Sequence, residues 1–349
     1  RRAAPRSAAR GEAASGERRT ERSCRAGYTG AAPGGSDRPL PWLRRAARWF
    51  IVRSMQSAVG GVGFQINFFT RPLLDELERA GARIDYLEIL CDTVSGSLEG
   101  PHLVEPRHAG WLADLQRRYP LVAHSNFGEE YGFAELDDTP CVRRHVPIAR
   151  AMGAAWMTDH MFYGTQSTSY LWSTPIQFSA AEIRRVAARA RRLQELLGMP
   201  LLHENAFIYA LFPGSDLGEA EFLSGLVEQA GTHLLLDVHN VYANSINFAG
   251  LDPWQYIDRI PLDRVLEIHV AGGQWIDGWY HDLHNDCVPE PVWELVQHVL
   301  ERSRSVRGVT LEVQGPVHTA QSRPIDAGWR DMALRDLERI AALWSRTRG

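Results

Sequence analysis

Eight short apolar runs, alternating with amphipathic stretches, constrain the fold of this sequence more than any other feature. The runs occupy residues 61–66, 84–90, 120–124, 156–161, 200–204, 233–238, 264–270 and 308–313. The segments between them have helical periodicity, and several close on Gly or Pro. Strands that alternate with helices pair in parallel, and eight such units over roughly 290 residues fit a (β/α)8 barrel. The alternative, a doubly wound open sheet, lacks a GxGxxG motif after the first run.

The first 54 residues differ in composition from the rest of the chain. They carry 13 Arg against four acidic residues, whereas the remainder carries 25 Arg against 38 acidic residues. A stretch rich in Arg, Ala, Gly and Ser without an apolar period is typical of disorder. We predict a basic, disordered leader over residues 1–54 and one domain over residues 55–349. A nucleic-acid arm or a transit peptide is the alternative for the leader, and a chain that begins at Met55 is expected to fold and bind metal.

The acidic body and the cysteines exclude several classes of function. Neutralisation of phosphate dominates affinity for nucleic acid, so an acidic body argues against a nucleic-acid substrate. Cys24, Cys91, Cys141 and Cys287 lie far apart without a CxxC pair, which argues against a disulfide framework and a cysteine-rich zinc site. No apolar run reaches the length of about eighteen residues that a membrane span needs. A reducing cytoplasm is the expected location.

Polar residues end most of the predicted strands. The stretch HLLLDVHNVYAN begins as a buried strand should and ends in Asp237, His239 and Asn240. In a (β/α)8 barrel the carboxyl ends of all strands open on one face, where the active sites of this fold lie. The other polar residues at or near such ends are Asp92, His124, Asp159, His160, Glu204, Asn205, His269, Asp282, His284 and Glu312.

Metal ions explain this convergence better than separate structural roles do. A lone strand histidine is usually a hydrogen-bonded core residue, and a strand-end aspartate often caps the next helix. Several carboxylates buried together, however, are costly without positive charge, and neither Lys nor Arg occurs among these positions. Histidines and carboxylates without cysteine suit Fe, Mn or Zn. So many histidines and carboxylates are more than one four- to six-coordinate ion uses, so the sequence predicts two or three metal ions.

The same stretches resemble a known family, the multinuclear non-haem iron-dependent oxidative enzymes of modified-peptide biosynthesis. This family includes the methanobactin oxidase and has a xylose-isomerase-like TIM-barrel fold. The similarity runs from GVGFQ at residue 61 to LEVQ at residue 314, through VAHS, TDHM, LLHEN, LLDVHNVYANSIN, EIHVAG and DLHNDCVPEPVW. The resemblance implies eight metal ligands, namely His124, His160, Glu204, Asp237, His269, Asp282, His284 and Glu312.

The resemblance also implies the chemistry. It implies two or three Fe ions per chain with O2 as co-substrate, and oxidation of a cysteine-containing precursor peptide made on the ribosome. Asn205, His239 and Asn240 are then the candidate catalytic residues beside the metals. The chain departs from the family in Asp92, which replaces Glu, and in His239, which replaces Asn.

If the segment after Asp237 stays extended, Asp237 and His239 share a face, with His239 at the edge of the ligand set.

Two further functions stay open at this point. With Zn or Mn the barrel could be a hydrolase or isomerase of the endonuclease-IV or xylose-isomerase-like class, and a metal-storing or partner-binding barrel is the non-enzymatic alternative. The acidic body opposes DNA, and the absence of Lys opposes those sugar isomerases that use one. The aromatic stretch at residues 162–178 is longer than a usual βα loop. We predict it to be either a lid or a contact for the peptide or a small recognition protein.

Overall fold

Eight parallel strands close a barrel in the order β1-β10-β7-β6-β5-β4-β3-β2. The computed structural model describes residues 59–67, 70–126, 128, 131–163, 174–314 and 327–348. The barrel strands are β1 Gly61–Ile66, β2 Tyr86–Leu90, β3 Leu121–Ser125, β4 Met157–His160, β5 Leu201–Glu204, β6 His233–Asp237, β7 Val265–Val270 and β10 Gly308–Leu311. The predicted (β/α)8 barrel is confirmed, and each strand lies within two residues of its predicted range. The leader predicted over residues 1–54 lies outside the described residues.

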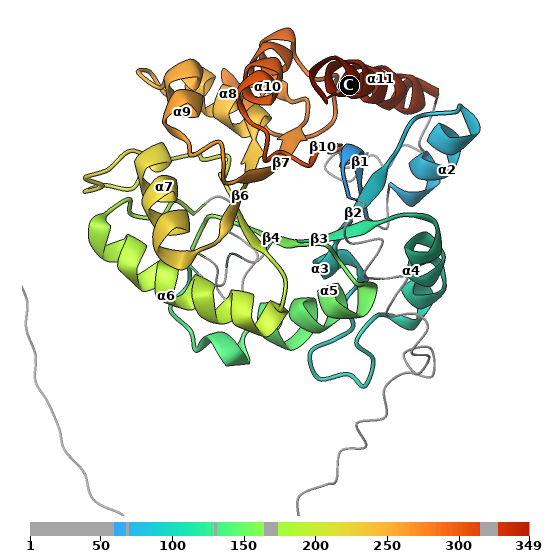
Figure 1. Ribbon diagram of the computed structural model, residues 1–349, viewed down its shortest axis with the longest axis horizontal. Coiled ribbons are helices and arrows are strands. Elements are labelled where there is room, and N and C mark those ends of the chain that lie inside the picture. Colours follow the sequence, from blue (N-terminus) through green and yellow to red (C-terminus); the bar gives the residue numbers. More distant parts are fainter. Residues whose placement is uncertain are drawn as a thin grey trace, which may run out of the picture. The chain divides into compact units, whose positions relative to one another are not determined.

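Helices surround this barrel (Figure 1). They are α2 Arg71–Arg79, α3 Cys91–Val94, α4 Pro106–Arg118, α5 Val146–Met152, α6 Ala180–Leu197, α7 Glu219–Ala230, α8 Val238–Asn247, α9 Pro253–Arg259, α10 Glu290–Arg302 and α11 Ala327–Arg348, with a 3-10 turn at Leu136–Asp138 and a π-helical turn at Cys141–His145. Their apolar faces pack on outward strand residues such as Leu87, Ile89 and Leu236. In the described part of the chain, no helix combines the length and the apolar character that crossing a membrane requires.

Local signals explain where the longer helices begin and end. The hydroxyl of Ser179 caps α6 by accepting a hydrogen bond from the amide of Glu182 at 3.2 Å. Gly198 ends the same helix in the left-handed conformation, with φ of 67°, which glycine adopts without steric cost. A short antiparallel hairpin, β8 Gln274–Ile276 and β9 Trp279–His281, follows β7 outside the barrel.

The inward residues of the barrel strands form an apolar floor below a polar layer. Side chains of a strand alternate between its two faces, so residues two apart point the same way. The floor is a buried cluster of Val59, Tyr86, Val122, Trp156, Leu202 and Leu235. Two residues further along the same strands lie Glu88, His124, Thr158, Glu204 and Asp237, which are all buried. The change from apolar to polar along β2, β3, β4, β5 and β6 therefore places a polar layer at the carboxyl end of the barrel.

Close packing around Tyr86 holds this floor together. The Tyr86 hydroxyl donates to Glu267 Oε1 at 3.0 Å and lies 2.7 Å from Thr310 Oγ1. Trp156 Nε1 donates to Glu267 Oε2 at 2.6 Å. Burial, followed by the charge of Glu88, raises the pKa of the Glu267 carboxyl to about 7. The tyrosine ring fits here because Gly63 on β1 has no side chain.

Replacing Gly63 with alanine is expected to destabilise the barrel. A Cβ at Gly63 would lie 2.4 Å from Tyr86 Cζ and 2.4 Å from Thr310 Oγ1, closer than packing permits. Such overpacking costs about 1–3 kcal/mol, so thermal unfolding should begin at a lower temperature. Gly110→Ala is the matched control, because a Cβ there meets nothing within 4 Å and α4 gains a better helix former. Equal melting temperatures for Gly63→Ala and the wild-type protein would contradict the packing argument.

Candidate metal centre

Three overlapping groups of side chains at the carboxyl end of the barrel have the geometry of metal ligands. In each group one candidate ligand atom per residue lies within 4.8 Å of all the others. The groups are Glu88, His124 and His269; His124, His160 and Glu204; and Glu204, Asp237, His269 and Glu312. Six of the eight ligands implied by the resemblance are in these groups. The remaining two, Asp282 and His284, adjoin them through Glu312.

Glu204 at the end of β5 lies between the second and third groups. Its Oε2 lies 3.3 Å from His124 Nε2 and 3.2 Å from His160 Nε2. Its Oε1 lies 3.5 Å from His269 Nδ1 on β7, two strands away in the barrel. Both oxygens are buried, and neither makes a hydrogen bond. A carboxylate that faces two histidine sets with different oxygens has the arrangement of a bridge between two adjacent ions.

Asp237 at the end of β6 has one carboxylate oxygen that is hydrogen-bonded to the main chain and one that has no hydrogen bond. Its Oδ1 accepts a hydrogen bond from the amide of Asn240 at 2.7 Å, which caps α8. Its Oδ2 is buried without a hydrogen-bond partner, and Asp237 is a member of the third group. Asn205 fixes the backbone: its Oδ1 accepts from the Asp237 amide at 2.9 Å, and its Nδ2 donates to the Asp237 carbonyl at 2.8 Å.

Asn240 completes this clamp by donating from Nδ2 to the Asn205 carbonyl at 3.1 Å. Both side-chain polar atoms of Asn205 are therefore used on the backbone of Asp237. These contacts hold the ends of β5 and β6 in register. A catalytic role for Asn205 and Asn240 stays a prediction.

The loop after the β8–β9 hairpin brings Asp282 and His284 to the centre. Asp282 Oδ1 lies 2.7 Å from His284 Nε2 and 3.0 Å from His239 Nδ1. His284 Nε2 lies 3.7 Å from Glu312 Oε2, which connects this pair to the third group. His284 has a φ of 51°, a conformation that is uncommon for residues other than glycine and that often marks functional sites.

The expectation that Asp237 and His239 share a face of an extended segment is wrong. The strand ends at Asp237, and α8 begins at Val238, so His239 lies in the first helical turn. The imidazole is nevertheless fully buried. Its Nδ1 faces Asp282, and its Nε2 lies 3.3 Å from the Tyr280 hydroxyl. His239 thus adjoins the centre through Asp282 rather than through Asp237.

Asp92 and Asp159, the other two carboxylates at strand ends, lie outside the three groups. Asp92 is part of α3, where its Oδ2 lies 3.5 Å from Asn126 Nδ2, and burial raises the pKa of its carboxyl. Asp159 Oδ1 accepts hydrogen bonds from the amides of Gly128 and His160, each at 2.9 Å. Asp159 therefore organises the chain around β4.

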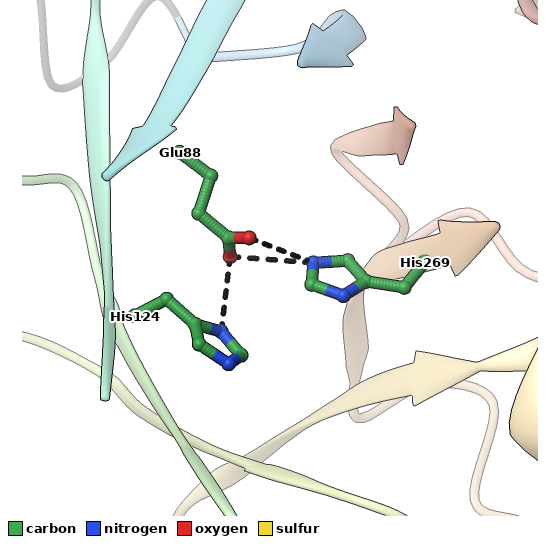
Figure 2. A group of neighbouring side chains, drawn as sticks. All are labelled: Glu88, His124 and His269. Atoms are coloured by element: carbon green, nitrogen blue, oxygen red, sulfur yellow. Dashed lines mark hydrogen bonds and ion pairs between the residues drawn. The ribbon is translucent and has the colours of Figure 1, made fainter. Parts of the chain in front are cut away.

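The sequence interpretation missed Glu88 and Gln65. Glu88 on β2 is fully buried and lies between His124 and His269 (Figure 2). Gln65 on β1 donates from Nε2 to Glu88 Oε1 at 2.9 Å and also to Glu312. Asp92 was selected instead because it is the polar residue that follows the second apolar run. The alternation along this strand nevertheless indicates Glu88, because Tyr86, Glu88 and Leu90 share the inward face.

Histidines lie beside the carboxylates of the centre and balance their charge. In the described part of the chain, every ion pair of its carboxylates is formed with an imidazole. Burial, and then the charges of Glu204, Glu312 and Asp282, raise the pKa of Asp237 well above its ordinary value. Burial alone would lower the pKa of His124, but Glu88 and Glu204 raise it to about 10.

These residues fit a metal ion by their chemistry. Asp237 Oδ2, both Glu204 oxygens and His269 Nδ1 are buried without hydrogen bonds, and such atoms need a partner. Imidazole and carboxylate donors without thiolate suit first-row metals such as Fe, Mn or Zn. Opposing carboxylates that face one another are stabilised when a cation lies among them.

The affinity for metal is expected to rise with pH. In the metal-free centre the pKa of both His124 and His284 is raised from the ordinary value of 6.5 to about 10. For His284, burial alone would lower the pKa, but the charges of Asp282 and Glu312 raise it. Both imidazoles are then protonated between pH 6.5 and 10, and a metal must displace these protons. Each displaced proton makes the affinity about tenfold higher per pH unit. Zn²⁺ competition titrations between pH 6.5 and 8.5 measure this slope, and a flat profile would contradict it.

The chain is similar to a known protein family and to several known proteins. The model of the RiPP precursor modification enzyme family MbnB/TglH/ChrH matches residues 60–322. A UPF0276 protein of Anaeromyxobacter sp. strain Fw109-5 is 30% identical over 249 residues, which are 69% of this chain and 81% of the relative. A UPF0276 protein of Bordetella bronchiseptica is 33% identical over 247 residues, again 69% and 81%.

Among solved structures, a putative xylose isomerase from Rhodospirillum rubrum superposes with a TM-score of 0.51. The sequence identity is 16%, and the match covers 81% of this chain and 99% of that one. At this identity the likeness concerns the barrel fold alone.

Proposed function

This chain belongs to the MbnB/TglH/ChrH family of RiPP precursor modification enzymes, and on that premise we propose that it is a multinuclear non-haem iron oxidase. Its substrate is a cysteine-containing peptide made on the ribosome, and O2 is the co-substrate. The ions are two or three Fe per chain, and the ligands are the eight residues His124, His160, Glu204, Asp237, His269, Asp282, His284 and Glu312.

The position of Glu204 is the observation that carries this proposal. Its Oε2 faces His124 and His160 and its Oε1 faces His269, so this carboxylate could help to hold more than one ion. When bound, iron supplies the redox chemistry that side chains lack, including the activation of O2 and the binding of a thiolate. A ligand set of imidazole and carboxylate is compatible with such redox-active metals.

The side chains of this site hold the centre and limit the access of water. The side chains of His124, Glu204 and His269 have no exposed surface, whereas that of His160 is 24% exposed. Substrate is therefore expected to approach on the His160 side. Asp282 lies next to His239, whose Nε2 faces the Tyr280 hydroxyl. Burial raises the pKa of that phenol to about 12, so it stays protonated and can donate to His239 Nε2.

The peptide partner remains part of the proposal. The central part of the aromatic stretch, residues 164–173, lies outside the described residues. At its described ends, Tyr163 donates from its hydroxyl to Glu182 at 3.1 Å and accepts from the Gln177 amide at 3.3 Å, which draws the ends together. The ring of Tyr163 lies against Phe133, which is 71% exposed. We propose the aromatic surface formed by Phe133 and Tyr163 as a contact for the peptide or for a small recognition protein.

Coexpression with candidate cysteine-containing precursor peptides tests the function. The expected result is a change in peptide mass that needs both iron and O2 and that disappears when the peptide cysteine is replaced by serine. The matched protein control is Glu290→Gln, an exposed carboxylate on α10. Hydrolysis or isomerisation by a zinc-loaded chain without O2 consumption would contradict the proposal.

A further inference from the structure

Each imidazole next to Glu88 faces carboxylates with both of its nitrogens. His124 Nδ1 lies 3.3 Å from Glu88 Oε2, and its Nε2 lies 3.3 Å from Glu204 Oε2. His269 Nε2 lies 3.1 Å from Glu88 Oε1, and its Nδ1 lies 3.3 Å from Glu312 Oε2. Figure 2 shows the two rings approaching the Glu88 carboxylate from different directions. The two histidines therefore use opposite nitrogens toward Glu88.

The chemistry of imidazole makes the first ligand group incompatible with the other two. A neutral imidazole carries one N–H donor and one lone pair, so it binds metal through one nitrogen and donates through the other. A metal held by Glu88 would take the lone pairs of His124 Nδ1 and His269 Nε2. The second and third groups would then each lose a histidine. If Glu88 binds no metal, both of those groups keep their full ligand sets.

We propose that Glu88 is a positioning residue, which accepts the Nδ1–H of His124 and the Nε2–H of His269 and so fixes the nitrogen that each presents to metal. This inference rests on the metal centre proposed above. A carboxylate behind a ligating histidine is a recurrent way to set its tautomer and ring orientation. Here one carboxylate serves two histidines on opposite walls of the barrel, β3 and β7.

Gln65 holds Glu88 in this position. Gln65 Nε2 donates to Glu88 Oε1 at 2.9 Å and also to Glu312 Oε1. Glu88 and Gln65 are only 0% and 1% exposed, so water does not compete for these hydrogen bonds. Gln65 therefore connects the carboxylate that anchors the histidines to a carboxylate of the third group.

Metal binding to the full chain distinguishes a positioning residue from a ligand. Glutamine at position 88 keeps the size but offers one acceptor oxygen for two N–H groups. Glu88→Gln should bind the wild-type number of Zn²⁺ ions with about 10–100-fold weaker affinity, the usual effect of losing such a partner. Glu290→Gln is the matched control, the same substitution at an exposed carboxylate on α10 that pairs with Arg339. It should retain its affinity within about threefold, and melting temperatures compare the folding of both variants.

Nitrogen-15 spectra of the imidazoles in the Zn²⁺-loaded wild-type chain give a second measurement. His124 should carry its proton on Nδ1 and His269 on Nε2, a pattern that a purely structural role for Glu88 does not require. Three results would overturn the inference: loss of a whole metal equivalent in Glu88→Gln, unchanged affinity in that variant, or the reverse tautomers. A wild-type chain that binds no metal would overturn the centre itself, and this inference with it.

Discussion

Glu204→Gln is expected to lose at least one metal equivalent and all O2-dependent turnover. Glu204 is the member shared by the second and third ligand groups, and its two oxygens face different histidines. A carboxamide retains one weakly coordinating oxygen and cannot bridge two cations as an anion does. The affinity of the remaining sites should fall as well, because each loses a negative ligand. Metal content after anaerobic reconstitution with Fe(II) gives the number directly.

The control for this variant is Glu290→Gln, which should keep the full metal count because its carboxylate pairs with Arg339 on the surface. A melting temperature for metal-free Glu204→Gln near that of the metal-free wild type would exclude misfolding as the cause. Full metal loading of Glu204→Gln would contradict the bridging role.

Asp237→Ala is expected to abolish at least one metal equivalent and turnover, and Asp237→Asn separates this effect from helix capping. Alanine also removes the cap of α8, worth about 1 kcal/mol, whereas asparagine keeps an oxygen that accepts from the Asn240 amide. Both variants should therefore lose metal, but only Asp237→Ala should lose the cap. Retention of every metal by Asp237→Asn would remove Asp237 from the ligand set.

The metal-free forms should show the opposite trend for Asp237→Asn. Because the pKa of Asp237 is raised above its ordinary value of 3.8, its charge opposes folding at neutral pH and ceases to do so in acid. Metal-free Asp237→Asn should therefore unfold at a higher temperature than the metal-free wild type at pH 7 to 8.

His239→Asn, which restores the residue usual in the family, should keep the full metal count and activity. Loss of a metal in His239→Asn would make His239 a ligand.

The sequence predicted the barrel and the region of the centre because both depend on simple periodicities. Apolar runs alternating with amphipathic helices predict parallel strands, and a polar residue at the end of an apolar strand predicts the carboxyl face of the barrel. Glu204 and Asp237 could be found in this way from single strands. The chain order of the motifs then added Asp282 and His284, which lie on a loop that strand patterns do not describe.

Other features depend on contacts between strands far apart in the sequence. The alternation of residues along β2 places Glu88 on the inward face, but its partners His124 and His269 come from other walls of the barrel and cannot be identified from that strand. The position of His239 depends on where β6 ends, and one residue decides whether the segment is strand or helix. Asn205 contacts the backbone of Asp237 instead of projecting freely, which a residue pattern cannot indicate.

Metal analysis of the chain purified without oxygen tests the central claim most directly. The measurement is the number and identity of bound ions, followed by O2 consumption after exposure to air with a cysteine-containing precursor peptide. We predict two or three Fe per wild-type chain, with O2 consumed only when iron is bound. Zinc as the sole metal, with no O2 consumption after replacement by Fe(II), would contradict the account.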